Sequence, residues 1–277
     1  MKKCFHSRHK NNFGDVLNKH MFDALFDDWK RVKPWKANYF MIGSIIDKVL
    51  QDGTKFHFKN LFKKKDDLTL LGTGFIQPSP FKKDLIHKNI IPVAVRGETT
   101  KARLESMGVD CSETVLGDWG LIADKFVDFE KKEKKYDVGI IPHYVDKEHP
   151  TLKRFDGDNR VKILDISRNP KDFIEGVCEC ETVLSSAMHG LIIADALKIP
   201  NLALRLSDLV VGGEYKFNDY YSVFGKKVKF LYPKDLDEID DLKKYISENY
   251  ELSNDEIDRV KKNIYDCFLK VKKVNKK

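Results

Sequence analysis

The chain has 277 residues and a formal net charge of +7; 42% of its residues are hydrophobic and 34% are charged. This composition supports a hydrophobic core and excludes both a disordered chain and a small protein that depends on disulfides. The five cysteines are scattered, and no run approaches the roughly 18 apolar residues of a membrane-spanning helix. The basic N-terminus has no apolar run behind it, so we expect no signal peptide and a cytoplasmic protein.

Short apolar segments alternate with segments of helical periodicity along most of the chain. Strands are predicted at Lys3–His6, Tyr39–Ile42, Leu68–Leu71, Pro92–Val95, Tyr136–Ile141, Val161–Ile166, Glu181–Leu184, Leu202–Leu206 and Lys227–Leu231. Helices are predicted at Asp15–Trp29, Glu98–Met107, Pro170–Cys178, His189–Leu197, Asp235–Asn249 and Asp255–Val271. Several strands are almost wholly apolar, which is typical of parallel sheets covered by helices on both faces.

A highly charged stretch, Asp128 to Lys135, precedes a fresh strand in the middle of the chain. Such a stretch is typical of a domain boundary. The predicted fold is therefore α/β, with two Rossmann-like domains at residues 1–130 and 131–277. The second domain would include a long C-terminal helix and a lysine-rich tail, although the final helix could pack against either half.

Much of the positive charge lies in blocks at Lys63–Lys65, Lys131–Lys135 and Lys270–Lys277. Such blocks are either solvated surface or attract anions, among them a phosphorylated substrate and an anionic membrane face. No aromatic residues are interleaved with these lysines and no nucleic-acid motif is present, so we expect no nucleic-acid partner. A peripheral contact with the inner face of the membrane is one consequence of this charge.

Open parallel sheets bind ligands at the carboxyl ends of their strands, so the loops there are the predicted site. The first such loop runs from His6 into a helix, and it brings Asp15 and Asn18 onto the first helical turn. Asp15 either caps this helix or faces the substrate. Glycines at Gly43 and Gly74 follow two further strands, where they permit tight turns or a close approach to a ligand.

Arg96 ends the predicted strand Pro92–Val95, immediately before a helix. A buried arginine needs a partner, and its planar guanidinium suits bidentate binding of phosphate or carboxylate. Arg96 is therefore either a structural ion pair or an anion ligand, and we predict an anion ligand.

His189 is the sharpest feature, at the turn between the strand ending near Leu184 and the apolar helix that follows. Ser185, Ser186 and Gly190 surround it in the run Ser-Ser-Ala-Met-His-Gly. A helix N-terminus disfavours the imidazolium form, so we expect a neutral histidine that exchanges a proton near pH 7. The alternative is a histidine that only packs in the core or caps the helix.

Further positive groups follow other strands: Arg205 and Lys216 in a polar glycine-bearing loop, and His143 after the strand Tyr136–Ile141. We predict that these side chains contact substrate, although Arg205 and Lys216 could equally be solvated. No group of histidines and carboxylates has the spacing of a metal site, and no G-x-S-x-G motif is present. We expect no metal and no cofactor.

The assembled motifs resemble the polysaccharide pyruvyl transferase family, of the short bacterial exopolysaccharide type. They are Asn12 to Asn18, Arg96-Gly97 with its helix, Leu116-Gly117-Asp118, Ser185 to Gly190, and Ala194 to Leu197. This resemblance implies two Rossmann-like domains like those of GT-B glycosyltransferases, with the active site in the interdomain cleft. It also implies phosphoenolpyruvate as donor and a nucleotide- or lipid-linked saccharide as acceptor, which would receive a pyruvate ketal.

Many members of that family carry arginine two residues before the motif histidine, where this chain has Ala187. Arg96, Arg205, Lys216 and His143 are the candidates for holding the donor anion instead. His189 would transfer protons, with Asp15 as partner base. The alternatives are a GT-B glycosyltransferase that uses a nucleotide-sugar, and a saccharide-binding member without catalytic activity.

Overall fold

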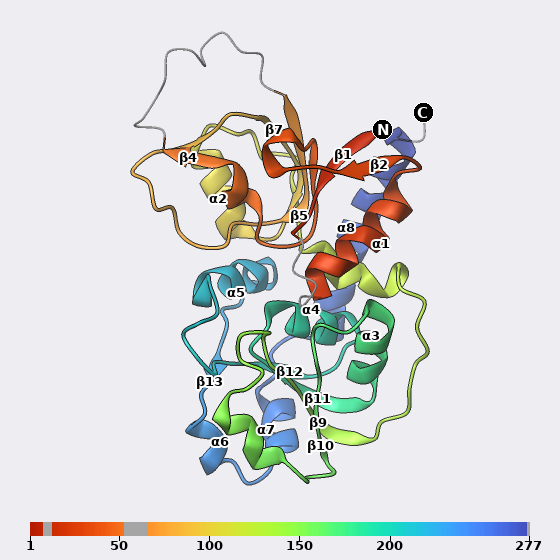
Figure 1. Ribbon diagram of the computed structural model, residues 1–277, viewed down its shortest axis with the longest axis vertical. Coiled ribbons are helices and arrows are strands. Elements are labelled where there is room, and N and C mark those ends of the chain that lie inside the picture. Colours follow the sequence, from red (N-terminus) through yellow and green to blue (C-terminus); the bar gives the residue numbers. More distant parts are fainter. Residues whose placement is uncertain (8–12, 53–65, 276–277) are drawn as a thin grey trace.

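The structure is a computed structural model that describes residues 1–7, 13–52 and 66–275. Two parallel sheets, each flanked by helices, lie at opposite ends of an elongated molecule (Figure 1). The α/β class and the parallel sheets are as predicted. The predicted loop at residues 8–12, the block Lys63–Lys65 and the last two residues of the tail lie outside the described residues.

The first sheet has the strand order β2-β1-β3-β5-β7-β8, and every neighbouring pair is parallel. Its strands are β1 (Lys2–Phe5), β2 (Trp29–Arg31), β3 (Tyr39–Phe40), β5 (Asp67–Thr73), β7 (Asn89–Val95) and β8 (Val115–Leu116). Helix α1 (Phe13–Leu25) follows β1, and α2 (Glu98–Ser106) follows β7. A two-stranded antiparallel ribbon, β4 (Leu50–Asp52) with β6 (Asp84–Ile86), is attached to this part of the chain.

The second sheet has the strand order β10-β9-β11-β12-β13, again wholly parallel. Its strands are β9 (Tyr136–Ile141), β10 (Val161–Ile163), β11 (Cys180–Ser185), β12 (Asn201–Leu204) and β13 (Phe230–Leu231). The helices here are α3 (Pro170–Cys178), α4 (Met188–Ala196), α5 (Gly213–Tyr221), α6 (Asp235–Glu238) and α7 (Leu242–Asn249). The last helix, α8 (Asn254–Asn275), returns to the first sheet and contacts β7 and β8.

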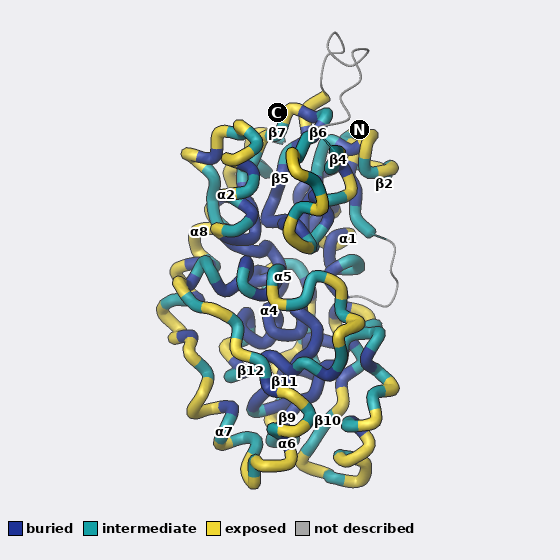
Figure 2. Tube along the Cα trace, turned by 90° about the vertical axis from the view of Figure 1, so that its left-hand side faces the viewer, coloured by how far each residue is buried: buried dark blue, intermediate teal, exposed yellow. Residues whose placement is uncertain are grey.

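The largest apolar cluster joins the inner helices of both sheets. Phe13 of α1 packs on Phe173 of α3 with ring centroids 4.8 Å apart, and α4 packs on the 3-10 helix Trp119–Lys125. All nine residues of α4 are buried, as expected for a helix that is apolar around its whole circumference. Figure 2 shows this buried middle, with exposed residues concentrated at the outer surface and the far loops.

Two predicted helices and one predicted loop differ substantially from the structure. The helix predicted to reach Trp29 ends at Leu25, and Trp29 begins the edge strand β2 while its ring packs 5.0 Å from that of Phe22. The helix predicted over Asp235–Asn249 is two helices, because the Asp241 carboxylate accepts a hydrogen bond from the Lys244 backbone and caps α7.

The segment after Gly212 was predicted as a loop because of its two glycines, but it contains α5. Gly212 has a φ of 90° and makes the turn that precedes this helix. The helix is held by the burial of Phe217, Tyr220 and Tyr221. Tertiary packing therefore outweighs the local preference of the glycines for a turn.

Candidate active site

A cavity of about 320 Å³ lies where loops from the two sheets meet. Its residues follow the carboxyl ends of β1, β3, β5, β9, β10, β11 and β12, which is where parallel sheets bind ligands. The lining consists of Ser7, Asp15, Gly43, Ser44, Ile45, Lys48, Ile76, His143, Tyr144, Ile166, Ala187, Met188, His189, Leu209, Val211 and Lys216. Four of the predicted site residues, Asp15, His143, His189 and Lys216, therefore line one cavity.

His189 is the second residue of α4, and its side chain is wedged against α1. A methyl group placed on Gly14 would lie 2.3 Å from His189 Cε1, so the ring packs directly on the glycine backbone. The residue is only 8% exposed, and its Nε2 has no hydrogen-bond partner within the described part of the chain. A buried polar atom left without a partner is costly, and here it belongs to a residue that lines a cavity.

Burial lowers the pKa of His189 to about 3, and the positive charges of Arg96 and Lys216 add to this effect. The expected neutral form is therefore present, but the expected titration near pH 7 is wrong for this state. The physical reason is that the imidazole is enclosed and surrounded by positive groups. The negative charge of a bound anion would oppose the effect of the positive groups and raise the pKa of His189.

The pKa values of two other groups that line the cavity, His143 and Lys216, are lowered as well. Burial lowers the pKa of His143 to about 4, with Lys216 contributing and Asp146 opposing. Burial likewise lowers the pKa of Lys216 to about 8, with Arg96 contributing. Lys216 is 7% exposed, and its ammonium donates a 2.8 Å hydrogen bond to the backbone carbonyl of Val211.

Among the described residues, the charged side chains that line the cavity are two lysines, Lys48 and Lys216, and one aspartate, Asp15. Lys48 was not among the predicted site residues, because an exposed lysine in a 3-10 helix carries no local signal. The buried guanidinium of Arg96 acts at longer range, since its charge lowers the pKa of both His189 and Lys216. The cavity is therefore electropositive, which suits an anionic ligand.

Arg96 does not line this cavity. Its side chain is fully buried, and Nε donates to Asp219 Oδ2 of α5 at 2.8 Å. Nη1 donates to Ser44 Oγ and Nη2 to the Phe75 carbonyl, both at 2.5 Å. The structure thus shows the structural ion pair, which was the predicted alternative to anion binding. This ion pair joins the end of β7 in the first sheet to α5, which follows a strand of the second sheet. Only Ser44, its hydrogen-bond partner, reaches the cavity.

Ser185 and Gly190 shape the turn that presents His189. The Ser185 hydroxyl is buried, accepts from the Ala187 backbone at 3.1 Å, and lies within hydrogen-bond distance of the Ala187 and Ile141 carbonyls. A methyl on Gly190 would lie 2.3 Å from Ser185 Oγ, so only glycine fits there. Neither residue lines the cavity. Both fix the shape of the turn that positions His189.

Asn18 performs a similar task in α1. Its amide nitrogen donates to the carbonyls of Gly14 and Ile42, and its oxygen accepts from the Ile42 backbone at 3.1 Å. These bonds hold the end of β3 against α1 and leave Asn18 fully buried, away from the cavity.

Asp146 is an important residue that the sequence reasoning missed. It is 2% exposed, and its carboxylate accepts hydrogen bonds from Ser186 Oγ at 2.7 Å and from Ser207 Oγ at 2.5 Å. The Ser186 hydroxyl in turn accepts from the His143 backbone at 2.8 Å. Asp146 therefore ties together the loops after β9, β11 and β12. Its two serine partners are 40 and 61 positions away in the sequence, so no local pattern marks it.

Asp118 was noted only as part of the motif Leu116-Gly117-Asp118. It is fully buried; its Oδ1 accepts from the Gly120 backbone at 2.8 Å, and its Oδ2 has no hydrogen-bond partner among the residues described. Burial raises its pKa to about 6. A methyl on Gly120 would lie 3.0 Å from Asp118 Oδ1 and 3.8 Å from His189 Cδ2, so this carboxyl lies behind the histidine.

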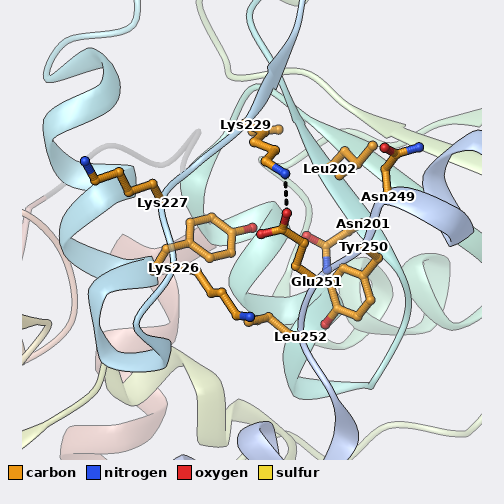
Figure 3. A pocket seen from close by; sticks show the side chains of 11 residues that line it. Asn201, Leu202, Lys226, Lys227, Lys229, Asn249, Tyr250, Glu251 and Leu252 are labelled. Atoms are coloured by element: carbon orange, nitrogen blue, oxygen red, sulfur yellow. Dashed lines mark hydrogen bonds and ion pairs between the residues drawn. The ribbon is translucent and has the colours of Figure 1, made fainter.

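Arg205 and Ser186 face a second cavity of about 260 Å³, not the first. Arg205 pairs there with Asp208, with Nη2 and Oδ1 2.8 Å apart. A third pocket, of about 30 Å³, lies beside Lys229, Tyr250 and Glu251, where Lys229 and Glu251 form an ion pair (Figure 3). It has room for little more than about two waters.

Among the residues that the structure describes, no three histidine, cysteine or carboxylate side chains are grouped as metal ligands. Within the same residues, no helix has the length and apolar character needed to cross a membrane.

The fold and the site define a class: a parallel α/β protein whose strand ends present a buried histidine and two lysines to an electropositive cavity. The chain belongs to the polysaccharide pyruvyl transferase family, because the sequence profile of that family matches residues 12–208. Among its relatives is an uncharacterized protein of Acanthamoeba polyphaga mimivirus, 35% identical over 223 residues. That match covers 77% of this chain and 71% of the viral protein.

Another relative is the succinoglycan biosynthesis protein ExoV of Rhizobium meliloti, 24% identical over 226 residues. The match covers 81% of this chain and 65% of ExoV. Among solved structures, an uncharacterized protein of Klebsiella pneumoniae is similar with a TM-score of 0.41 and 14% identity, over 83% of this chain and 92% of that one.

Proposed function

We propose that this protein transfers a pyruvyl group from phosphoenolpyruvate to a saccharide of a cell-surface polysaccharide or its precursor. The observation that carries the proposal is the electropositive cavity, which suits a donor that bears a carboxylate and a phosphate. Membership of the polysaccharide pyruvyl transferase family supports the choice of such a donor. The relative ExoV is named for succinoglycan biosynthesis, which agrees with a polysaccharide product.

The reaction joins two hydroxyls of one sugar to the central carbon of the donor. The methylene carbon of phosphoenolpyruvate gains one proton, the bond between the central carbon and the phosphate oxygen breaks, and two new carbon–oxygen bonds form. Of the two protons that the hydroxyls lose, one is matched by the proton gained in forming the methyl group, and the other leaves with inorganic phosphate. The protein must therefore hold an anion and move protons from the two sugar hydroxyls to the methylene carbon and to the departing phosphate.

His189 is our choice for the proton transfers, with Asp15 as the partner base. Burial holds the pKa of His189 at about 3, so the ring is neutral and can accept a proton. The negative charge of a bound donor raises this pKa and favours the protonated form, which can then deliver a proton. Lys216 and Lys48 would hold the donor anion, and the Arg96–Asp219 ion pair would fix Ser44 at the cavity wall.

We further propose that the two sheets correspond to Rossmann-like domains at residues 1–130 and 131–277, arranged as in GT-B glycosyltransferases. The lining of the cavity by loops from both sheets supports this arrangement. A cytoplasmic location remains a prediction, and contact with an anionic membrane face remains a prediction from the charge of the chain.

The test is incubation of the wild-type protein with phosphoenolpyruvate and a panel of nucleotide- and lipid-linked sugars. Phosphate release and the mass of one added pyruvyl group are measured. His189→Gln should reduce turnover by about 10²–10⁴-fold, which is typical for loss of a group that transfers protons. His20→Gln, at an exposed position of α1, is the matched control and should turn over like the wild type.

Wild-type turnover by His189→Gln would contradict the assignment of that residue. Thermal shifts separate the alternative functions, because stabilisation reports binding to the folded state. Stabilisation by a nucleoside diphosphate but not by phosphoenolpyruvate would support a glycosyltransferase instead.

A further inference from the structure

The second cavity, of about 260 Å³, adjoins the candidate active site. Val211 lines both cavities, and at three places consecutive residues of the chain face one cavity and then the other. These places are Ile76 with Gln77, Ser186 with Ala187, and Asp208 with Leu209. The two cavities therefore adjoin along these segments and at Val211.

The chemistry of the second cavity differs from that of the first. Arg205 and Asp208 are its charged lining residues, and they neutralise one another in an ion pair. The apolar part of the wall includes the aromatic rings of Phe217 and Phe230, whose centroids are 5.2 Å apart. The polar part includes Ser186 and Ser207, while Gly212, Gly213 and other loop residues complete the lining.

An apolar face beside fixed hydroxyl, carboxylate and guanidinium groups suits an uncharged ring that carries several hydroxyls. A phosphate or carboxylate would gain little here, because the Asp208 carboxylate cancels the charge of Arg205. Asp146 accepts hydrogen bonds from both Ser186 and Ser207, so these two side chains are held in fixed positions. Such fixed polar groups in an apolar cavity are typical of small-molecule sites.

We propose that the second cavity is the acceptor subsite, and that it binds a neutral hexopyranose ring whose hydroxyls reach the first cavity past Val211 and Ala187. This inference rests on the proposed function, which requires two substrates to meet. The donor is anionic and suits the electropositive cavity, and the acceptor ring is uncharged and suits the neutral one. The two cavities thus divide the two substrates by charge.

The probes are neutral methyl hexopyranosides of the gluco, galacto and manno series, observed by saturation-transfer NMR, which detects weak binding. The wild-type protein should transfer saturation to at least one glycoside, and phosphoenolpyruvate should not displace it. Val210→Trp places a large ring in the second cavity, which Val210 lines, and should abolish the signal. Val274→Trp, at a 73% exposed position on α8, is the matched control and should retain it.

Competition by phosphoenolpyruvate, an unchanged signal in Val210→Trp, or no saturation of any glycoside by the wild type would each overturn the subsite. Once an acceptor is turned over, Val210→Trp should raise its KM by about tenfold or more and leave the KM for phosphoenolpyruvate unchanged. An equal rise in both KM values would contradict the division of substrates between the cavities.

The subsite and the proposed function can fail separately. If phosphoenolpyruvate stabilises the protein and Lys216→Met removes that effect while no glycoside binds, donor binding stands and the subsite is wrong. If a glycoside binds in a manner sensitive to Val210→Trp while phosphoenolpyruvate neither binds nor reacts, the saccharide subsite stands and pyruvyl transfer is wrong.

Discussion

Acidification from pH 7 to pH 5 should destabilise the protein through His189, and the effect can be worked out from its burial. An imidazole in the unfolded chain has a pKa near 6.5, whereas burial in the folded protein lowers the pKa of His189 to about 3. Over this interval the unfolded state takes up a proton that the folded state does not. Stability is therefore complete above about pH 6.5 and falls steadily as the pH drops toward 3.

Between pH 7 and pH 5 the contribution of His189 alone is about 2 kcal/mol of unfolding free energy. This figure depends on the pKa of the unfolded histidine and holds for any folded pKa well below 5. His189→Gln has no group that titrates there, so its loss of stability over the interval should be smaller than that of the wild type by about the same 2 kcal/mol.

The assay is urea unfolding of both proteins at the two pH values, with linear extrapolation to zero denaturant. Only the change between pH values is compared, so any cost of the substitution itself cancels. His20→Gln, on the exposed face of α1, should show the pH dependence of the wild type. If His189→Gln loses as much stability as the wild type, His189 is not held neutral by burial and the reasoning is refuted.

Two other substitutions probe the contacts around the cavity. Gly14→Ala brings a methyl group to 2.3 Å from His189 Cε1. It should lower the free energy of unfolding by about 1–3 kcal/mol, despite the better helix propensity of alanine. Urea unfolding of the double variant with His189→Ala should show that most of this loss is recovered. Arg96→Met leaves the buried Asp219 carboxylate without its cation and should lower the free energy of unfolding by about 3–5 kcal/mol. The double variant with Asp219→Asn should be more stable than Arg96→Met alone. If the losses of the two single variants simply add in the double variant, the direct ion pair is contradicted.

Local patterns in the sequence located most of the described strands and the loops that follow them, but they missed the short strands β2, β4, β6 and β8. Each of the nine predicted strands has a counterpart, and β9 and α3 have the predicted bounds. Since the carboxyl ends of parallel strands meet at one edge of a sheet, residues after different strands could be expected together. Asp15, His143, His189 and Lys216 do line one cavity.

The partners of buried charges could not be predicted in this way. Arg96 follows a strand and precedes a helix, as an anion ligand would, yet it pairs with Asp219, which is 123 positions away. Asp146 binds Ser186 and Ser207 across three loops, and α8 packs on β7 and β8 of the first sheet although it follows the strands of the second.

The difference has one physical cause. Hydrophobic periodicity and turn residues act within a few positions, so the sequence by itself determined the α/β class, the parallel strands and the turn that carries His189. The partners of buried polar groups are set only when distant segments pack together. Each buried charge or hydroxyl needs a hydrogen-bond or ion-pair partner, and in the completed fold that partner can come from a distant part of the chain. The tertiary structure alone therefore decided that Arg96 forms an internal ion pair, and that several of the predicted site residues lie in two adjoining cavities.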